Sequence, residues 1–304
     1  MPVSSDDSAQ LTHSKNSIKL LAWRPDGVAL GYASLDDEPK KKDEAKFEVA
    51  FEVGKNGYLE RSRALPNHLW LIDTAGGETK RLTSGNWSLP NHFAPAGPPS
   101  QISFTPDGKW SVFVKAGSPL SGDTNSSRLE VLDVASGALR RITEAMSEES
   151  NPVLSPDGTH LAYSFSRDGK VRNEATQYDA PVAGDSGKGI AFALDRNIGN
   201  AAWMPDAKSL LIAGADGTHS VMSMQPLDGK AKQVDLGGLN AGAFNASKDG
   251  EVAFAATNTT HAPELFYMAR AGDAPTQLTH LQTVTEGVAL GKPETVAWKS
   301  DGSM

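Results

Sequence analysis

Cysteine is absent from this chain of 304 residues, which excludes disulfide bonds, thiolate nucleophiles and cysteine-ligated zinc or iron–sulfur sites. No apolar stretch approaches the roughly 18 residues that a transmembrane helix needs, so no membrane partner is expected. The net charge of −8 argues against nucleic acid as a partner. Residues 1–7 show no basic region followed by an apolar core, so we expect no secretory signal; the compartment stays open, with the cytoplasm as the default.

Motifs for common catalytic and cofactor sites are also missing. Neither a dinucleotide-binding glycine motif nor a phosphate-binding P-loop occurs, so ATP and NAD are not expected as cofactors. The seven histidines are dispersed and show no HExxH or His-x-His spacing. The string nearest to a Gly-x-Ser-x-Gly nucleophile elbow, residues 184–189, has the wrong spacing and no strand-to-helix pattern around it. This chain is therefore not expected to be a serine peptidase on its own.

A repeated turn is the main feature that the sequence does contain. Three copies read Pro-Asp-Gly, and three weaker copies keep the aspartate. The copies lie at residues 25–27, 106–108, 156–158, 205–207, 248–250 and 300–302. Four of the five steps between successive aspartates are 43 to 52 residues long, a period typical of β-propeller blades. The long first step contains the charged segment 36–63, which we interpret as a solvent-exposed insertion. Aspartates at turns accept hydrogen bonds from their own backbone amides, so we interpret these as structural.

Strand-like segments around each turn define the predicted fold. A large apolar residue stands three positions before the aspartate in five of the six copies, and a β-rich run follows most turns. A third strand and a short fourth strand, ending in Leu-Thr or Ile-Thr, complete several repeats without any helical period. We therefore predict an all-β chain, with residues 1–304 forming a single β-propeller domain of five or six four-stranded blades. Trp23, Phe104 and Trp203 are predicted to be buried between blades.

The two ends of the repeat array leave the number of blades open. Five nearly complete blades are predicted to start near Ile18, Gln101, Asn151, Asn200 and Asn240. A sixth, composite blade could form from residues 8–12 and 295–299, since propellers commonly close by pairing strands from both termini. The alternative is that both ends were cut from a longer repeat array. Unpaired end strands expose edges, so we expect either closure of the ring or a homo-oligomer through these edges.

Four features together resemble one family. They are the Pro-Asp-Gly turns, the Leu-Thr endings, the charged insertion after Leu35, and the His68-Leu69-Trp70 strand. They resemble the N-terminal propeller of the prolyl oligopeptidase clan of serine peptidases. Within that clan the resemblance is strongest to the acylaminoacyl-peptidase or dipeptidyl-aminopeptidase branch. Residues 294–302 resemble that clan's crossover into its hydrolase domain. The chain is similar, less specifically, to the TolB propeller, which has the same turns without a catalytic domain. The resemblance implies a cap that filters peptides for a C-terminal α/β-hydrolase domain, whose catalytic residues have no counterpart here.

Loops from different blades meet around the channel of a propeller, and here they hold candidate metal ligands. The candidates are His92, Glu148, Glu149, Asp195 and His280. Imidazoles and carboxylates suit Zn²⁺ or Mn²⁺, and such an ion could activate a water molecule for hydrolysis. The competing interpretation is that these are solvated loop charges on an acidic protein, since no pair has a diagnostic spacing.

Three functional hypotheses follow. The first is a substrate-gating and interaction propeller whose partner is the missing C-terminal α/β-hydrolase domain or a peptide. The second is a free-standing propeller with metal-assisted hydrolase activity on esters or phosphoesters in its central channel. The third is a TolB-like protein-binding module. Trp87 and Phe93, in the loop 85–99, are further candidates for contact with the channel or a partner.

Overall fold

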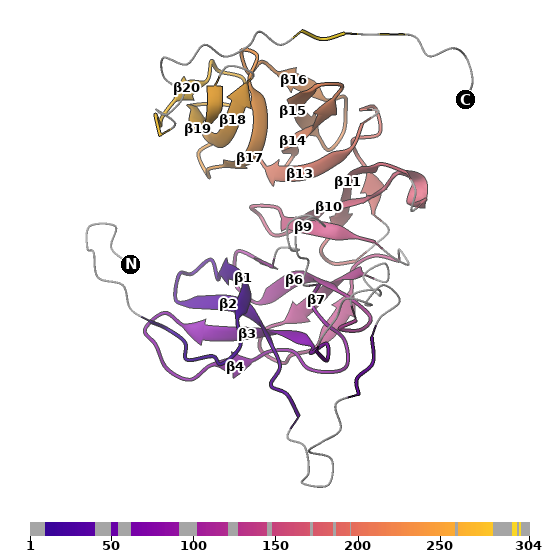
Figure 1. The fold of residues 1–304 in the computed structure, drawn as a ribbon, viewed down its shortest axis with the longest axis vertical. Coiled ribbons are helices and arrows are strands. Elements are labelled where there is room, and N and C mark those ends of the chain that lie inside the picture. The colour runs from indigo at the N-terminus through magenta and orange to yellow at the C-terminus, as the bar shows by residue number, and fades with distance from the viewer. Residues whose placement is uncertain are drawn as a thin grey trace. The chain divides into compact units, whose positions relative to one another are not determined.

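The computed structural model consists of β-strands arranged in small antiparallel sheets (Figure 1). It describes residues 10–39, 50–53, 62–90, 102–120, 127–144, 148–170, 173–184, 187–194, 196–258, 261–281, 294–296 and 298. Twenty strands and one short 3-10 turn, η3 (Arg167–Gly169), lie in these residues, which contain no α-helix. None of the helical structure in this part of the chain is long and apolar enough to cross a membrane. The predicted all-β class is confirmed.

The strands form five sheets of four, each in sequential order, which we number as blades 1 to 5. Blade 1 contains β1 (Ile18–Trp23), β2 (Ala29–Leu35), β3 (Asn67–Asp73) and β4 (Lys80–Arg81). Blade 2 contains β5 (Ser103–Phe104), β6 (Trp110–Lys115), β7 (Arg128–Asp133) and β8 (Leu139–Arg141). Blade 3 contains β9 (Ser150–Leu154), β10 (His160–Ser166), β11 (Ala175–Pro181) and β12 (Lys188–Gly189). Blade 4 contains β13 (Ile198–Trp203), β14 (Ser209–Asp216), β15 (His219–Pro226) and β16 (Lys232–Val234). Blade 5 contains β17 (Asn240–Ala246), β18 (Val252–Asn258), β19 (His261–Met268) and β20 (Thr276–Gln277).

The Pro-Asp-Gly segments of blades 1 to 3 and their weaker copies in blades 4 and 5 join the first two strands of each blade, as predicted. The Asp26 carboxylate accepts a hydrogen bond from the Val28 N–H at 3.1 Å, and Asp107 accepts one from the Lys109 N–H at the same distance. The Thr105 hydroxyl and the Lys109 amide lower the pKa of Asp107 to about 2. These contacts give Asp26 and Asp107 a structural role in their turns.

Glycine is needed in these turns for two reasons. Gly158 has φ of +72°, which side chains other than glycine adopt only with strain. It also lies against the turn of the preceding blade, where an added Cβ would be 2.6 Å from the Cδ atom of Pro106. Gly158 therefore sets both the turn and the close packing of blade 3 against blade 2.

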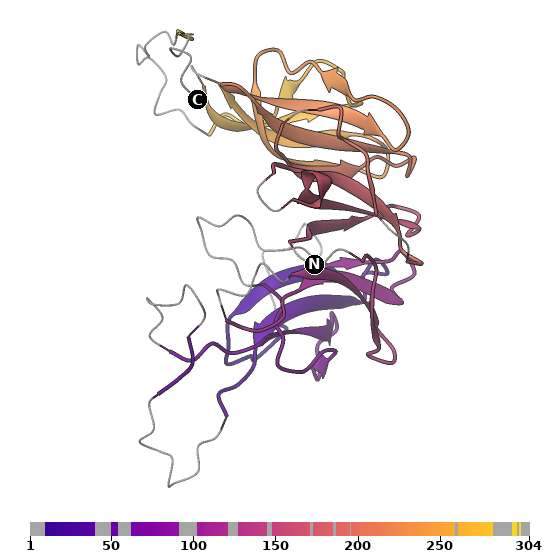
Figure 2. The ribbon, with the colours of Figure 1, turned by 90° about the vertical axis from the view of Figure 1, so that its right-hand side faces the viewer.

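The chain divides into two compact units. The first comprises residues 1–173 and 177–189, and the second comprises 174–176 and 190–304. In the first unit, hydrophobic cores lie between blades 1 and 2 and between blades 2 and 3. In the second unit, a core around Leu211, Met222 and Phe254 lies between blades 4 and 5, whose strands appear orange in Figure 2. Of the predicted closing blade, residues 8, 9, 297 and 299 lie outside the described residues, and residues 10–12, 295, 296 and 298 are described but lie in no strand. The closing blade stays a prediction.

Candidate functional site

The first strands of blades 1, 2 and 3 border a groove in the first unit. Strand β5 contacts both β1 and β9, so the three strands converge. The groove encloses about 780 Å³, a volume within the range of ligand-binding pockets. Its lining comprises Lys19–Trp23, Pro25, Ile102–Phe104, Pro106 and Leu154–Pro156. Lys19 is the one charged residue in this lining, so the groove is an apolar surface rather than an acid–base site.

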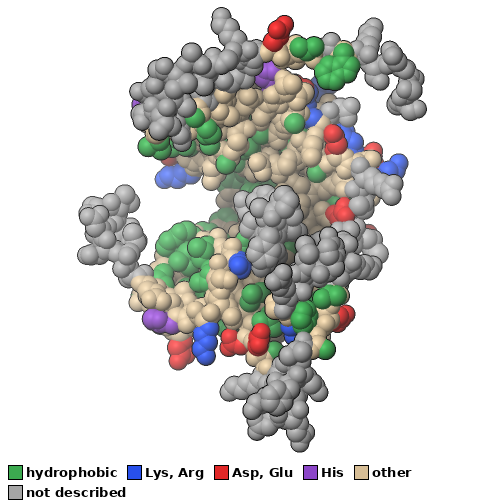
Figure 3. All heavy atoms as spheres, viewed as in Figure 1, with side chains coloured by type: hydrophobic (Ala, Val, Ile, Leu, Met, Phe, Trp, Pro, Cys, Tyr) green, Lys and Arg blue, Asp and Glu red, His purple; other side chains and the backbone are tan. Residues whose placement is uncertain are grey.

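The prediction for the aromatic layer is confirmed for two residues and wrong for the third. Phe104 and Trp203 are 7% and 6% exposed, whereas Trp23 is 58% exposed. Phe104 is buried because its ring lies over Gly31 of blade 1, where an added Cβ would be only 2.6 Å from the ring. Trp23, like the 67% exposed Leu21, is open to solvent. Figure 3 shows hydrophobic side chains in green on the face of the molecule that carries β1.

A row of paired residues runs from this groove across blade 1. Leu21 lies opposite Tyr32, Tyr32 opposite Trp70, and Trp70 opposite Arg81. Directly paired residues share one face of a sheet. The rings of Tyr32 and Trp70 are stacked at 6.5 Å, and the Arg81 guanidinium lies 5.4 Å from the centre of the Trp70 ring. The face of blade 1 that carries Leu21 at the groove therefore carries the charged Arg81 on its outermost strand, β4.

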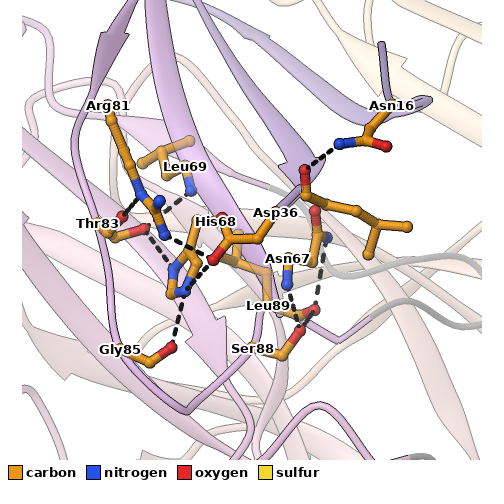
Figure 4. Close-up of polar contacts among 11 residues, drawn as sticks. Asn16, Asp36, Asn67, His68, Leu69, Arg81, Thr83, Gly85, Ser88 and Leu89 are labelled. Atoms are coloured by element: carbon orange, nitrogen blue, oxygen red, sulfur yellow. Dashed lines mark hydrogen bonds and ion pairs between the residues drawn. The ribbon is translucent and has the colours of Figure 1, made fainter. Parts of the chain in front are cut away.

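Arg81 belongs to a polar cluster that includes Asp36 and His68 (Figure 4). Asp36 follows β2, His68 lies in β3 and Arg81 ends β4. The Arg81 Nη2 atom is 2.8 Å from Asp36 Oδ2, and His68 Nε2 lies 3.8 Å from the same oxygen. The cluster attaches the start of the charged insertion to the outer strands of blade 1.

The hydrogen bonds of His68 determine its tautomer. Its Nε2 atom lies 3.1 Å from the Gly85 carbonyl oxygen, which can only accept, so Nε2 carries the proton. Its Nδ1 atom, 3.1 Å from Thr83 Oγ1, then accepts from that hydroxyl. The Thr83 oxygen in turn accepts the Leu69 N–H at 2.9 Å. Burial lowers the pKa of His68, so the neutral ring is favoured.

A second cavity of about 730 Å³ adjoins this cluster. Residues 11–16, Tyr32, Asp36, Trp70 and Arg81 contribute to its lining. The buried Asp36 Oδ1 and Trp70 Nε1 atoms have no hydrogen-bond partner among the described residues. Two of the residues that line the cavity thus each carry a buried polar atom without a partner in the described structure, an acceptor on Asp36 and a donor on Trp70. Sequence reasoning did not single out Asp36 or Arg81, because only the pairing of β2, β3 and β4 brings them together.

The predicted metal ligands are not assembled within the described residues. His92 and Asp195 lie outside this part of the chain. Glu149 is fully buried and accepts hydrogen bonds from the Leu129 N–H at 3.1 Å and from the Thr143 hydroxyl, and burial raises the pKa of its carboxyl group.

The other two candidate ligands lie in different units. Glu148 is half-buried with φ of +64° in the first unit. His280 is exposed in the second unit, with Nδ1 at 3.2 Å from Gln277 Nε2. No group of three or more histidine and carboxylate side chains suited to a metal occurs in the described part of the chain. The metal site stays a prediction.

Of the two aromatic candidates, Trp87 lies in the described part of the chain and has a position in the packing. Trp87 is half-buried and stacks on Phe113 at 5.9 Å, with its edge toward His68 at 4.8 Å, so it belongs to the packing of blades 1 and 2. Phe93 lies outside the described residues. The repeated Leu-Thr ending also has a clear role. Thr83 and Thr279 use their hydroxyl oxygens to accept a backbone N–H from the third strand, both at 2.9 Å.

The sheet topology and the known structures that resemble it define a β-propeller. No family model matches the sequence. The chain is 28% identical over 176 residues to dipeptidyl-peptidase 5 of two Aspergillus fumigatus strains, a match that spans 54% of this chain and 22% of those relatives. It therefore corresponds to about a fifth of their length.

Two solved structures show the same fold. The acylaminoacyl peptidase of Pyrococcus horikoshii superposes with a TM-score of 0.67 at 16% identity, over 96% of this chain and 43% of that one. TolB of Acinetobacter baumannii superposes with a TM-score of 0.55 at 17% identity, over 90% of this chain and 56% of that one. The resemblance seen in the sequence, to peptidase propellers and to TolB, is thus confirmed.

Proposed function

We propose that this chain is a substrate-gating and interaction propeller that has no peptidase activity on its own. Its partner would be a peptide or a C-terminal α/β-hydrolase domain. The observation that carries the proposal is the groove between β1, β5 and β9, where Leu21 and Trp23 remain 67% and 58% exposed. Contiguous exposed apolar surface of this kind marks binding sites rather than ordinary protein surface.

The chemistry of the groove supports binding over catalysis. Its lining contains no histidine, aspartate or glutamate, which are the usual general acids and bases. The chain sequence contains no nucleophile elbow. The similarity to dipeptidyl-peptidase 5 and to an acylaminoacyl peptidase supports peptides as the ligand class.

The test compares binding and hydrolysis of the same peptides by the full chain. We expect apolar tetra- to hexapeptides to bind, as measured by fluorescence anisotropy, and to remain intact by mass spectrometry after incubation. Trp23→Ser should weaken binding, whereas Val28→Ser, at a 46% exposed turn position outside the groove lining, should not. Cleavage of the peptides by the chain alone, or absence of binding across the whole peptide set, would contradict the proposal.

A further inference from the structure

Strand β1 has one edge that is unpaired in the described part of the chain. There it pairs with β2 alone, and the Arg24 N–H donates to the Ala29 carbonyl at 2.9 Å. Because hydrogen-bonded and non-hydrogen-bonded pairs alternate in an antiparallel ladder, Ala22 bonds toward β2, whereas Leu21 and Trp23 direct their backbone groups away from it. Neither Leu21 nor Trp23 has a backbone hydrogen bond on that edge within the described residues.

Leu21 and Trp23, whose backbone groups are unpaired on this edge, also have solvent-exposed side chains. Leu21 and Trp23 are two positions apart and therefore lie on the same face of the strand. Both side chains are more than half exposed, and both border the groove. An occupant that satisfies both features must offer main-chain donors and acceptors together with apolar side chains.

We propose that the unpaired edge of β1 binds a short extended peptide as an added strand, with its apolar side chains packed on Leu21 and Trp23. The inference rests on the proposed function and extends it, because it specifies how the peptide would be recognised. Main-chain hydrogen bonds would hold any extended segment, and the two apolar side chains would select residues at alternate positions.

The shape of the groove favours a single peptide over a strand from a second copy. Residues 102–104 and 154–156 stand beside β1 in the groove and limit the free space to about 780 Å³. A second copy would have to bring a whole folded sheet to this edge. The prolines at 25, 106 and 156 also border the groove and have no N–H to donate. These three turn positions can therefore donate no main-chain hydrogen bond to the peptide.

The described part of the N-terminal segment does not line this site. Residues 11–16 line the second cavity, next to Asp36 and Trp70, and none of them lines the groove. The occupant is therefore sought in a separate peptide.

The experiment uses the full chain and acetyl-Leu-Ser-Leu-Ser-Leu-Ser amide with a fluorescein label, followed by anisotropy. Two analogues carry N-methyl groups, either on the leucine amides or on the serine amides. An added strand uses only every second amide for pairing. We therefore expect one analogue to bind at least about tenfold more weakly and the other to stay within about twofold of the parent. Equal affinity of all three probes, or equal losses for both analogues, would overturn the inference.

A protein variant provides the matching test. Leu21→Pro removes an N–H on the unpaired edge without removing a bond to β2, and proline is tolerated on edge strands. We expect binding at least about tenfold weaker, with unchanged far-ultraviolet circular dichroism. Leu21→Ala keeps the backbone amide and should therefore lose less peptide affinity than Leu21→Pro. If Leu21→Pro and Leu21→Ala bind equally well, the edge is not the binding element.

The outcomes separate this inference from the proposed function. Peptide affinity that is unchanged by N-methylation and by Leu21→Pro would overturn strand addition. It would leave the proposed function, peptide binding, in place. Peptide cleavage by the chain, or failure of every peptide to bind, would overturn the proposed function as well. A concentration-dependent doubling of mass in light scattering, abolished by Leu21→Pro, would identify a second copy as the occupant and overturn the peptide assignment.

Discussion

Replacing Phe104 and Trp23 by alanine should have very different effects on stability, although both occupy the same position in the repeat. Each stands three residues before the turn aspartate, and both belong to the first unit. Phe104 is 7% exposed and lies over Gly31, whereas Trp23 is 58% exposed. The pair therefore tests whether packing by a neighbouring blade decides the energetic role of this position.

The magnitudes follow from burial. Truncation of a fully buried aromatic residue to alanine costs about 3 to 5 kcal/mol, through lost burial and the cavity that remains. Phe104→Ala should fall in that range. Less than half of Trp23 is removed from water, so Trp23→Ala should cost only about 1 to 2 kcal/mol on the same scale. Trp203, which is 6% exposed, is the matched buried tryptophan in the second unit.

Urea unfolding followed by circular dichroism gives the free energies, provided that the slope with denaturant is unchanged between variants. Comparison of Trp23→Ala with Phe104→Ala within one unit avoids mixing two unfolding transitions. A loss of 3 kcal/mol or more at Trp23 would refute the reasoning, because it would mean that another surface covers this ring in solution. A loss below about 1 kcal/mol at Phe104 and Trp203 would refute the blade register itself.

Three further predictions concern single residues. Ala207 has φ of +53°, a conformation that costs non-glycine residues about 1 to 2 kcal/mol, so Ala207→Gly should raise stability to urea by about 0.5 to 1 kcal/mol, while Gly250→Ala, at φ of +87°, should lower it. The lowered pKa of His68 means that the unfolded state binds a proton near pH 6.5 before the folded state does, so stability should fall as pH drops below about 6.5. This contribution changes the free energy of unfolding by at most about 1.4 kcal/mol per pH unit, and His68→Gln should remove it. Identical plots of stability against pH for the variant and the parent protein would contradict the lowered pKa of His68. The metal hypothesis predicts stoichiometric Zn²⁺ or Mn²⁺ in purified protein that is lost in His92→Ala and His280→Ala, and metal content unaffected in both variants would contradict it.

Local features of the fold could be predicted from the sequence because short-range chemistry determines them. In four of the turns the aspartate accepts the amide two residues later, and the residue after the aspartate has a positive φ, which favours glycine. The alternation of apolar residues and the spacing of the turns determined the strands and the length of each blade. The burial of Phe104 and Trp203 also followed from their place in the repeat.

Long-range packing decided which side chains are buried and which distant residues meet, because the repeat alone does not determine these features. Trp23 has the same sequence position as Phe104, yet its exposure depends on which blade lies against it. Asp36 and Arg81 are 45 residues apart and meet only because β2, β3 and β4 pair in register. The carboxylate of Glu149, whose role as a metal ligand stays a prediction, accepts hydrogen bonds from Leu129 and Thr143 inside the first unit. The sequence determines which residues are available, and the neighbours supplied by tertiary structure determine whether a side chain is buried, paired or open to a ligand.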